Sequence, residues 1–286
     1  MNIVLCSISF RHQLVSFPDL IDFAGRTGFS GIELWGVHGR SLLRDRRREL
    51  PGLLEDMEAR GLGVSMISDY VDLLAPEDQT ALLLRRWDNL LDMAHAFRTR
   101  KIRIFAGNRA SAAATQREWT LCADRVSRLA RIAAERGVQL VIETHPHTYA
   151  DTLDSTLRLL RDAAPSPIGL NLDFLHLWET GTAPIEAYRQ LRTWIVNYHV
   201  KNVAALEQAG LFESGNVFSP SGKRDGMAAL ARGAIDYAAV FDQLHQDATP
   251  HPIAIEWFGE DPFALLEQER RWLAHWGRPE RAAAQA

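Results

Sequence analysis

Four residues that could hold a divalent metal ion follow short apolar runs of the sequence. They are Glu143, Asp173, His199 and Glu256. A carboxylate at the end of an apolar strand loses its hydration unless a partner replaces it, and three carboxylates that face one site repel one another. A divalent cation removes this conflict. Three carboxylates and one imidazole suit Mn²⁺ or Mg²⁺, with Co²⁺ or Zn²⁺ as substitutes, so the sequence predicts one divalent metal ion as cofactor.

Each predicted ligand also has a purely structural explanation. Glu143 or Glu256 could close a salt bridge at the rim of a barrel. Asp173 could cap the following helix, and His199 could be a buried histidine with satisfied hydrogen bonds. Together these explanations require independent coincidences at the ends of four consecutive strands. We therefore favour the metal site.

Two further side chains stand two residues beyond a predicted ligand. Because side chains alternate along a strand, His145 should point the same way as Glu143, and Lys201 the same way as His199. His145 is the candidate general base, since imidazole accepts a proton near neutral pH. Lys201 could stabilise an oxyanion beside the metal, or it could neutralise the local carboxylates.

Other polar residues fall where a substrate would be bound. Arg103 alternates with apolar residues in its strand and could bind a substrate carboxylate with its guanidinium fork, or pair with Glu33. Tyr70 and His12 follow the third and first strands, in the layer that lines a pocket. His176, just beyond the sixth strand, could orient a metal ligand or touch the substrate.

The elements that must position these residues are eight short runs rich in β-branched and apolar side chains. They span residues 3–9, 31–35, 63–68, 101–106, 138–143, 168–173, 195–201 and 252–257. Longer stretches with helical periodicity separate them, which is typical of βα units. Eight such units predict an α/β fold, a (β/α)8 TIM barrel, as one domain over residues 1–286. The predicted ligands end the last four runs, where barrel active sites are built.

Three local signals refine this pattern. Thr115 and Glu118 form a capping box before a helix. The segment 202–234 is about thirty residues long and exceeds the usual loop length. It would overhang the catalytic face as a lid or pocket wall, or else form a disordered surface excursion. The Ala-rich tail after Arg278 should be frayed.

The composition favours a soluble enzyme with a small-molecule substrate. The formal net charge of −4 argues against a nucleic-acid partner, which needs a basic surface. Two distant cysteines, Cys6 and Cys122, do not suggest a disulfide framework. The first residues run into a strand without a cationic leader, and no segment has the roughly twenty consecutive apolar residues of a membrane span. We expect a cytoplasmic protein without a membrane partner. Homodimers are common among such barrels, but the sequence identifies no interface.

Six strings spread over nearly the whole chain carry a family resemblance. They are LCSISFRHQL at 5–14, GIELWG at 31–36, MISDY at 66–70, IETHP at 142–146, NLDFLH at 171–176 and EWFG at 256–259. The sequence resembles the xylose-isomerase-like barrel superfamily. Within it, the strings are similar to the stand-alone bacterial 3-dehydroshikimate dehydratases, which make protocatechuate for catechol siderophores such as petrobactin.

The resemblance implies a hydro-lyase that forms protocatechuate by enolisation and water elimination. His145 beside Glu143 would remove the carbon-bound proton, while the metal would polarise the ring ketone. The residues implied around the substrate are Arg103, Lys201, Tyr70 and His12. One departure is Phe218, which stands where the relatives carry an aromatic hydroxyl, so hydrogen bonding in the pocket would differ.

Three other functions use parts of the same pattern. A ketose epimerase or isomerase needs the same metal but uses two carboxylates as acid and base, and it forms no aromatic product. An abasic-site endonuclease would need further metal ligands and a basic surface for DNA, neither of which is evident in this acidic chain. A non-catalytic regulator would bind metal and ligand without turnover.

Overall fold

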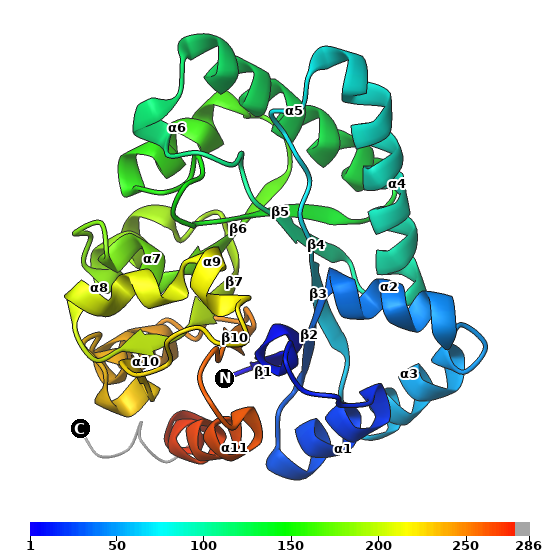
Figure 1. The fold of residues 1–286 in the computed structure, drawn as a ribbon, viewed down its shortest axis with the longest axis vertical. Helices are drawn as coiled ribbons and strands as arrows, with labels where there is room; N and C mark the ends of the chain where they lie inside the picture. Colours follow the sequence, from blue (N-terminus) through cyan, green and yellow to red (C-terminus); the bar gives the residue numbers. More distant parts are fainter. Residues whose placement is uncertain (278–286) are drawn as a thin grey trace.

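Eight parallel strands close into a barrel in the computed structural model, which describes residues 1–277 (Figure 1). The strands are β1 (Ile3–Cys6), β2 (Gly31–Trp35), β3 (Val64–Ser68), β4 (Lys101–Ile104), β5 (Gln139–Glu143), β6 (Ile168–Asp173), β7 (Ile195–Val200) and β10 (Ile253–Ile255). Their order around the barrel is β1-β10-β7-β6-β5-β4-β3-β2, and β2 pairs with β1 to close it. The eight predicted strands are therefore confirmed. Several are shorter than their apolar runs, because the chain leaves the ladder early; residues Ser7–Phe10, for example, form a 3-10 turn.

Helices surround the barrel and cover its outer face (Figure 1). They are α1 (Phe17–Thr27), α2 (Gly36–Asp45), α3 (Leu50–Ala59), α4 (Thr80–Ala96), α5 (Gln116–Glu135), α6 (Leu153–Asp162), α7 (Phe174–Trp178), α8 (Pro184–Leu191), α10 (Tyr237–Gln246) and α11 (Pro262–Leu273). The predicted capping box is present at the start of α5, where Thr115 and Glu118 exchange side-chain and backbone hydrogen bonds. No helix among the described residues is both long and apolar enough to cross a membrane. The Ala-rich tail after Arg278 lies outside the described residues.

The long segment 202–234 is ordered and folds over the barrel. Its ends form a two-stranded antiparallel ladder of β8 (Asn202–Val203) and β9 (Met227–Ala228). Between them lie a 3-10 helix (Leu206–Phe212) and α9 (Ser214–Val217). The Asn202 side chain donates hydrogen bonds to the carbonyls of Leu230 and Ile235. The alternative of a disordered excursion is therefore wrong, because these bonds satisfy the backbone at the base of the segment.

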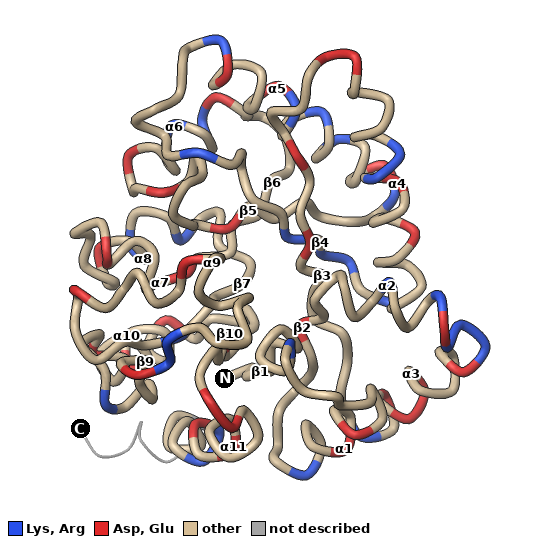
Figure 2. Tube along the Cα trace, viewed as in Figure 1, with Lys and Arg blue, Asp and Glu red and all other residues tan. Residues whose placement is uncertain are grey.

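Charged residues of both signs are interspersed along the outer helices (Figure 2). In the basic run at the end of α2, Arg44 pairs with Asp45 and Arg46 pairs with Glu49. Such exposed pairs contribute little to stability. A cluster of buried charges lies instead at the carboxyl ends of the strands.

Candidate metal centre and active site

Four buried side chains converge at the carboxyl end of the barrel. One ligand atom from each of Glu143, Asp173, His199 and Glu256 lies within 4.8 Å of the others. Nδ1 of His199 is 3.3 Å from Oε1 of Glu143, 3.5 Å from Oε1 of Glu256 and 3.9 Å from Oδ2 of Asp173. The strands that carry these residues are neighbours in the barrel, β5-β6-β7-β10. The structure thus brings the four predicted ligands together.

The cluster fits a divalent cation. Nδ1 of His199 is buried, has no hydrogen-bond partner among residues 1–277, and faces carboxylate oxygens. A lone pair surrounded by carboxylates is electrostatically unfavourable unless a cation or a proton lies between them. Three carboxylates and one imidazole are a donor set that Mn²⁺, Mg²⁺, Co²⁺ or Zn²⁺ can accept.

Asp173 combines two of the roles considered from the sequence. Its Oδ1 accepts hydrogen bonds from the backbone N–H groups of Leu175 and His176, which caps α7. Its Oδ2 remains directed to the cluster, 3.9 Å from Nδ1 of His199. Burial raises the pKa of Asp173 to about 6, although Lys201 opposes the shift.

Lys201 lies between two of the predicted ligands. Its Nζ is 2.5 Å from Oδ2 of Asp173 and 2.7 Å from Oε2 of Glu256. Burial alone would lower the pKa of Lys201, but these two carboxylates raise it above its usual range, so the side chain is cationic. The same contacts, together with His199, hold the pKa of Glu256 well below its usual range against the effect of burial. Lys201 therefore neutralises local carboxylates and also borders the cavity described next.

A cavity of about 330 Å³ adjoins the cluster, and we call it the reaction cavity. The predicted site residues that line it are Tyr70, Arg103, Glu143, His145, His176, Lys201 and Glu256. The segment 202–234 contributes Phe212, Ser214, Val217 and Phe218. The segment is thus a wall of the cavity. Phe218, the residue that departs from the family pattern, stacks on Trp35 with ring centroids 5.9 Å apart.

His145 presents one ring nitrogen that is free to act as a base. Its Nδ1 lies 2.8 Å from the carbonyl oxygen of Pro146, which is an acceptor only, so Nδ1 carries the proton and Nε2 keeps its lone pair. The ring packs against Phe105 and His176, with centroids 4.2 and 4.5 Å away. Burial, with a contribution from Lys201, lowers the pKa of His145 to about 4, although Glu143 opposes the shift. The imidazole is therefore neutral at pH 7.

Arg103 pairs with Glu143 rather than with Glu33. Its Nε is 2.7 Å from Oε2 of Glu143, and its guanidinium carbon lies over the rings of Tyr70 and Phe105 at 5.6 and 4.8 Å. Another nitrogen of the same group, Nη1, is buried without a hydrogen-bond partner. Because Arg103 lines the cavity, its Nη1 is available to donate a hydrogen bond to a bound carboxylate.

His12 does not line this cavity, contrary to the sequence prediction. Its side chain is exposed, and Nε2 lies 3.1 Å from the carbonyl oxygen of Val217. The 3-10 turn after β1 carries the chain outward before His12 is reached. The residue before it, Arg11, was missed, although it fastens the cavity wall: it donates to the carbonyls of Val217 at 2.6 Å and Phe258 at 2.8 Å. No sequence signal distinguished it from other surface arginines.

His176 and Glu33 meet two of the predicted ligands. Nδ1 of His176 is 2.8 Å from Oε1 of Glu179, and Nε2 is 3.7 Å from Oδ2 of Asp173. His176 therefore contacts a predicted ligand and also borders the cavity. Glu33 was considered only as a partner of Arg103; its carboxylate instead contacts His199. The position of Glu33 within the apolar strand 31–35 was the one available signal.

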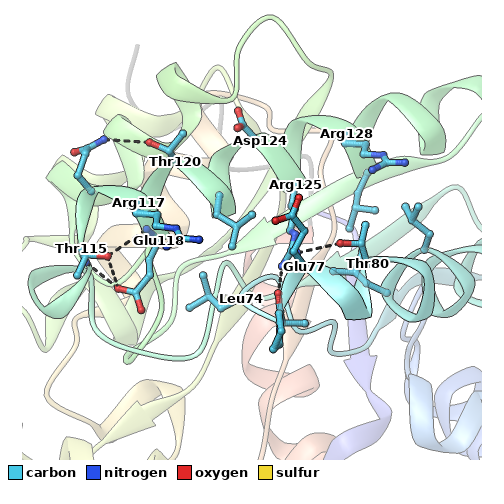
Figure 3. Close-up of a pocket in the computed structure, with 17 residues that line it drawn as sticks. Leu74, Glu77, Thr80, Thr115, Arg117, Glu118, Thr120, Asp124, Arg125 and Arg128 are labelled. Atoms are coloured by element: carbon cyan, nitrogen blue, oxygen red, sulfur yellow. Dashed lines mark hydrogen bonds between the residues drawn. The ribbon is translucent and has the colours of Figure 1, made fainter.

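Two larger cavities have different relations to the cluster. One of about 1370 Å³ shares Tyr70, Phe105 and His145 with the reaction cavity and extends it outward. Another of about 910 Å³ lies between the start of α5 and the loop before α4 (Figure 3). It contains none of the four cluster residues, and Arg125 there donates to the carbonyls of Leu73 and Ala75. The chemistry therefore belongs to the cavity at the strand ends.

Comparison with known proteins gives concordant matches. Residues 21–276 match the family model described as xylose isomerase-like TIM barrel. The chain is 37% identical over 275 residues to the 3-dehydroshikimate dehydratase of Bacillus anthracis, covering 96% of this chain and 97% of that protein. The crystal structure of the probable 3-DHS dehydratase AsbF involved in petrobactin synthesis, from the same organism, superimposes with a TM-score of 0.92 over 96% of this chain and 99% of that chain. The IOLI protein with a bound zinc atom shares the fold, with a TM-score of 0.74 and 17% identity over 97% and 96% of the two chains.

Proposed function

The chain belongs to the xylose isomerase-like TIM barrel family, and from this premise we propose that it is a metal-dependent 3-dehydroshikimate dehydratase that forms protocatechuate. The main structural observation in support of this proposal is that a neutral imidazole, His145, borders the same small cavity as the buried cluster of carboxylates and histidine. The similarity to a 3-dehydroshikimate dehydratase over nearly the full length of both chains supports this substrate. The relative named for petrobactin synthesis favours a role in supplying a catechol for a siderophore.

The residues that would hold the metal are Glu143, Asp173, His199 and Glu256. We favour Mn²⁺ or Mg²⁺, because three of the four ligands are hard carboxylate oxygens; Co²⁺ and Zn²⁺ are the substitutes. When bound, the ion would supply Lewis-acid polarisation of the ring ketone and its neighbouring hydroxyl.

The remaining steps fall to the side chains around the cavity. Nε2 of His145 takes the proton from the carbon next to the ketone. Lys201, held cationic by Asp173 and Glu256, stabilises the negative charge that develops on oxygen. The bond from the β-carbon to its hydroxyl then breaks. The proton returns from His145 to this leaving group, water departs, and tautomerisation gives the aromatic catechol.

Arg103 and Tyr70 would fix the substrate ring. The unpartnered Nη1 of Arg103 can donate to the ring carboxylate, while its Nε remains on Glu143. Holding the carboxylate at one end determines which ring proton faces His145 at the other. Tyr70 and His176 border the same space.

The geometry favours this reaction over ketose epimerisation. An epimerase of this type needs two carboxylates that exchange protons with carbon. Here burial would raise the pKa of Glu143, but Arg103 and His199 outweigh it and hold that pKa at about 2. Glu256 is likewise paired with Lys201. Strongly ionised, paired carboxylates are weak bases, whereas His145 is unpaired at Nε2.

The test is to follow ultraviolet absorbance while metal-stripped protein is incubated with 3-dehydroshikimate, before and after addition of Mn²⁺, Mg²⁺, Co²⁺ or Zn²⁺. We expect metal-dependent appearance of protocatechuate. It should be lost in Glu143→Ala and reduced by about 10²- to 10⁴-fold in His145→Ala. His245→Ala is the matched control, because His245 is exposed on α10 away from the three cavities and should keep full activity. A wild type that forms no catechol with any of the four metals would refute the proposal.

A further inference from the structure

We propose that Glu33 is a positioning residue for the metal centre: its carboxylate holds the Nε2–H of His199 and thereby presents Nδ1 of that ring as the metal ligand. The inference rests on the metal placement proposed above. It does not depend on which substrate is dehydrated.

The two side chains meet across the interior of the barrel. Glu33 is on β2 and His199 is on β7, and β1 and β10 separate these strands in the barrel wall. Nε2 of His199 lies 2.9 Å from Oε1 and 3.0 Å from Oε2 of Glu33, so it is almost equidistant from both carboxylate oxygens. Both residues are 0% exposed. Bulk solvent therefore does not reach this contact.

The chemistry of the two groups assigns the ring proton. An ionised carboxylate only accepts hydrogen bonds, so the nitrogen that faces it must donate. A neutral imidazole carries one N–H, and with that proton on Nε2 the lone pair is on Nδ1. Nδ1 is the nitrogen that lacks a hydrogen-bond partner and faces Glu143 and Glu256. The opposite tautomer would direct a lone pair at Glu33 and an N–H at the metal position.

Other donors fix the orientation of Glu33 independently of His199. The Ser68 hydroxyl donates to Oε1 in a short hydrogen bond, and Nδ2 of Asn197 lies 3.3 Å from Oε2. Asn197 is itself held by Asn171, at 2.9 Å. Because the carboxylate has partners on several sides, it cannot turn away from His199 without leaving buried polar groups unpaired.

Glu33 is separated from the substrate space. It is absent from the lining of the reaction cavity, where the predicted ligands Glu143 and Glu256 are found. Among the predicted metal ligands, its direct contact is with His199. A carboxylate behind a histidine ligand fixes the ring orientation and raises the basicity of the coordinating nitrogen.

The first experiment uses the wild-type protein loaded with Zn²⁺, a diamagnetic probe of the same site. Nitrogen NMR of the His199 ring should show a proton on Nε2 and a metal-bound Nδ1. Metal coordination through Nε2, or an Nε2 without a proton, would overturn the inference. This measurement requires no variant to fold.

The second experiment measures Zn²⁺ affinity by titration in folded variants. Glu33→Met removes the acceptor at similar size and should weaken binding by about 10- to 100-fold. Glu33→Gln keeps a carbonyl acceptor and should lose less. Glu269→Met is the matched control, since it makes the same replacement at a buried carboxyl on α11 that contacts Leu230 rather than His199, and its affinity should stay within about threefold of wild type.

Two outcomes of the titration contradict the inference. One is an unchanged affinity in Glu33→Met. The other is an equal loss in Glu269→Met, because the loss of any buried carboxylate would then have the same effect. No substrate is present in either experiment, so a failure here leaves the dehydration assay unaffected. A wild type that binds Zn²⁺ as described but forms no catechol would refute only the proposed function.

Discussion

Nε of Arg103 lies 2.7 Å from Oε2 of Glu143, and both side chains are 2% exposed. The pair joins adjacent strands, β4 and β5, and it links the group proposed to hold the substrate with a group proposed to hold the metal. Each therefore depends on the other. Without Arg103, the buried Glu143 would keep only its contact with His199; without Glu143, the buried Arg103 guanidinium would lose this carboxylate partner.

Replacing Arg103 by methionine should expose this dependence. Glu143 would lose Arg103, which together with His199 keeps its pKa at about 2, so its pKa should rise and protons should compete with the metal at mildly acidic pH. We expect Arg103→Met to destabilise the metal-free protein by about 3–5 kcal/mol, measured by denaturant unfolding. Arg103→Lys is the control: it retains the charge but not the fork, so metal affinity should be largely preserved. Equal metal affinity of Arg103→Met and wild type at pH 5 would contradict the coupling.

The pH dependence of the reaction should reflect His145. Its pKa, lowered by burial to about 4, is below the usual value of 6.5, and the neutral form is the base. The rate should therefore be constant above pH 6 and fall only as the pH drops through about 4, where the imidazole is protonated. The measurement is kcat/KM from pH 3.5 to 8 at saturating Mn²⁺, with metal occupancy checked at each pH. An acid limb centred near 6.5 would show that His145 is either solvated or not the base.

Metal binding should stabilise the fold. The native cluster gathers four ligands that are dispersed in the unfolded chain, so metal binds the native state preferentially. A metal concentration 100 times Kd should contribute about 2.7 kcal/mol, or about 5 °C in Tm. The check is a thermal melt with and without Mn²⁺ in wild type and Glu256→Ala. A shift of equal size in Glu256→Ala would place the stabilising ion elsewhere.

The sequence predicted the barrel well because parallel strands buried on both faces read as continuous apolar runs. Strand ends were less accurate. Apolar residues continue beyond the last ladder hydrogen bond, as in Ser7–Phe10, and periodicity alone does not show where the chain turns. The segment 202–234 could not be resolved for a related reason, since its order depends on Asn202 bonding to residues about thirty positions away.

The site was predictable where position on a strand determines direction. Two-residue spacing placed His145 with Glu143 and Lys201 with His199 around one space, as the alternation of strand side chains requires. Contacts across the barrel were not predictable. The partner of Glu33 depends on the relative height of β2 and β7, which no local pattern contains.

The cavity wall should loosen when Arg11 is replaced. Arg11 joins Val217 in the wall to Phe258 after β10 through two charge-assisted hydrogen bonds. Arg11→Met should raise KM about tenfold with a smaller change in kcat, because the wall would be held less firmly beside the substrate. His12→Ala is the comparison variant, since the exposed ring of His12 also contacts the Val217 carbonyl. A larger rise in KM for His12→Ala than for Arg11→Met would favour direct substrate contact by His12.

A stability test away from the reaction cavity concerns Glu269 on α11. This buried carboxyl accepts a hydrogen bond from the backbone N–H of Leu230 at 2.8 Å, which supports the end of the segment 202–234. Burial raises its pKa from 4.5 to about 7, against the opposing effects of Leu230 and Arg232. The folded state therefore prefers the protonated form. Its contribution to stability is complete below pH 4.5 and is lost as the pH rises through 7.

Glu269→Gln removes this titration but keeps the acceptor for Leu230. Relative to the variant, wild type should lose stability between pH 5 and pH 8, by at most about 3 kcal/mol. The measurement is the free energy of unfolding from denaturant titrations of both proteins at these two pH values. Glu267→Gln on the same helix is the matched control, because Glu267 pairs with Arg271 at the surface and its replacement should change stability little at either pH. The contrary outcome is that the difference in the free energy of unfolding between Glu269→Gln and wild type is the same at pH 5 and pH 8. Glu269 is then ionised in the folded protein over this whole range, and the fold accommodates a charged carboxylate beneath the segment 202–234.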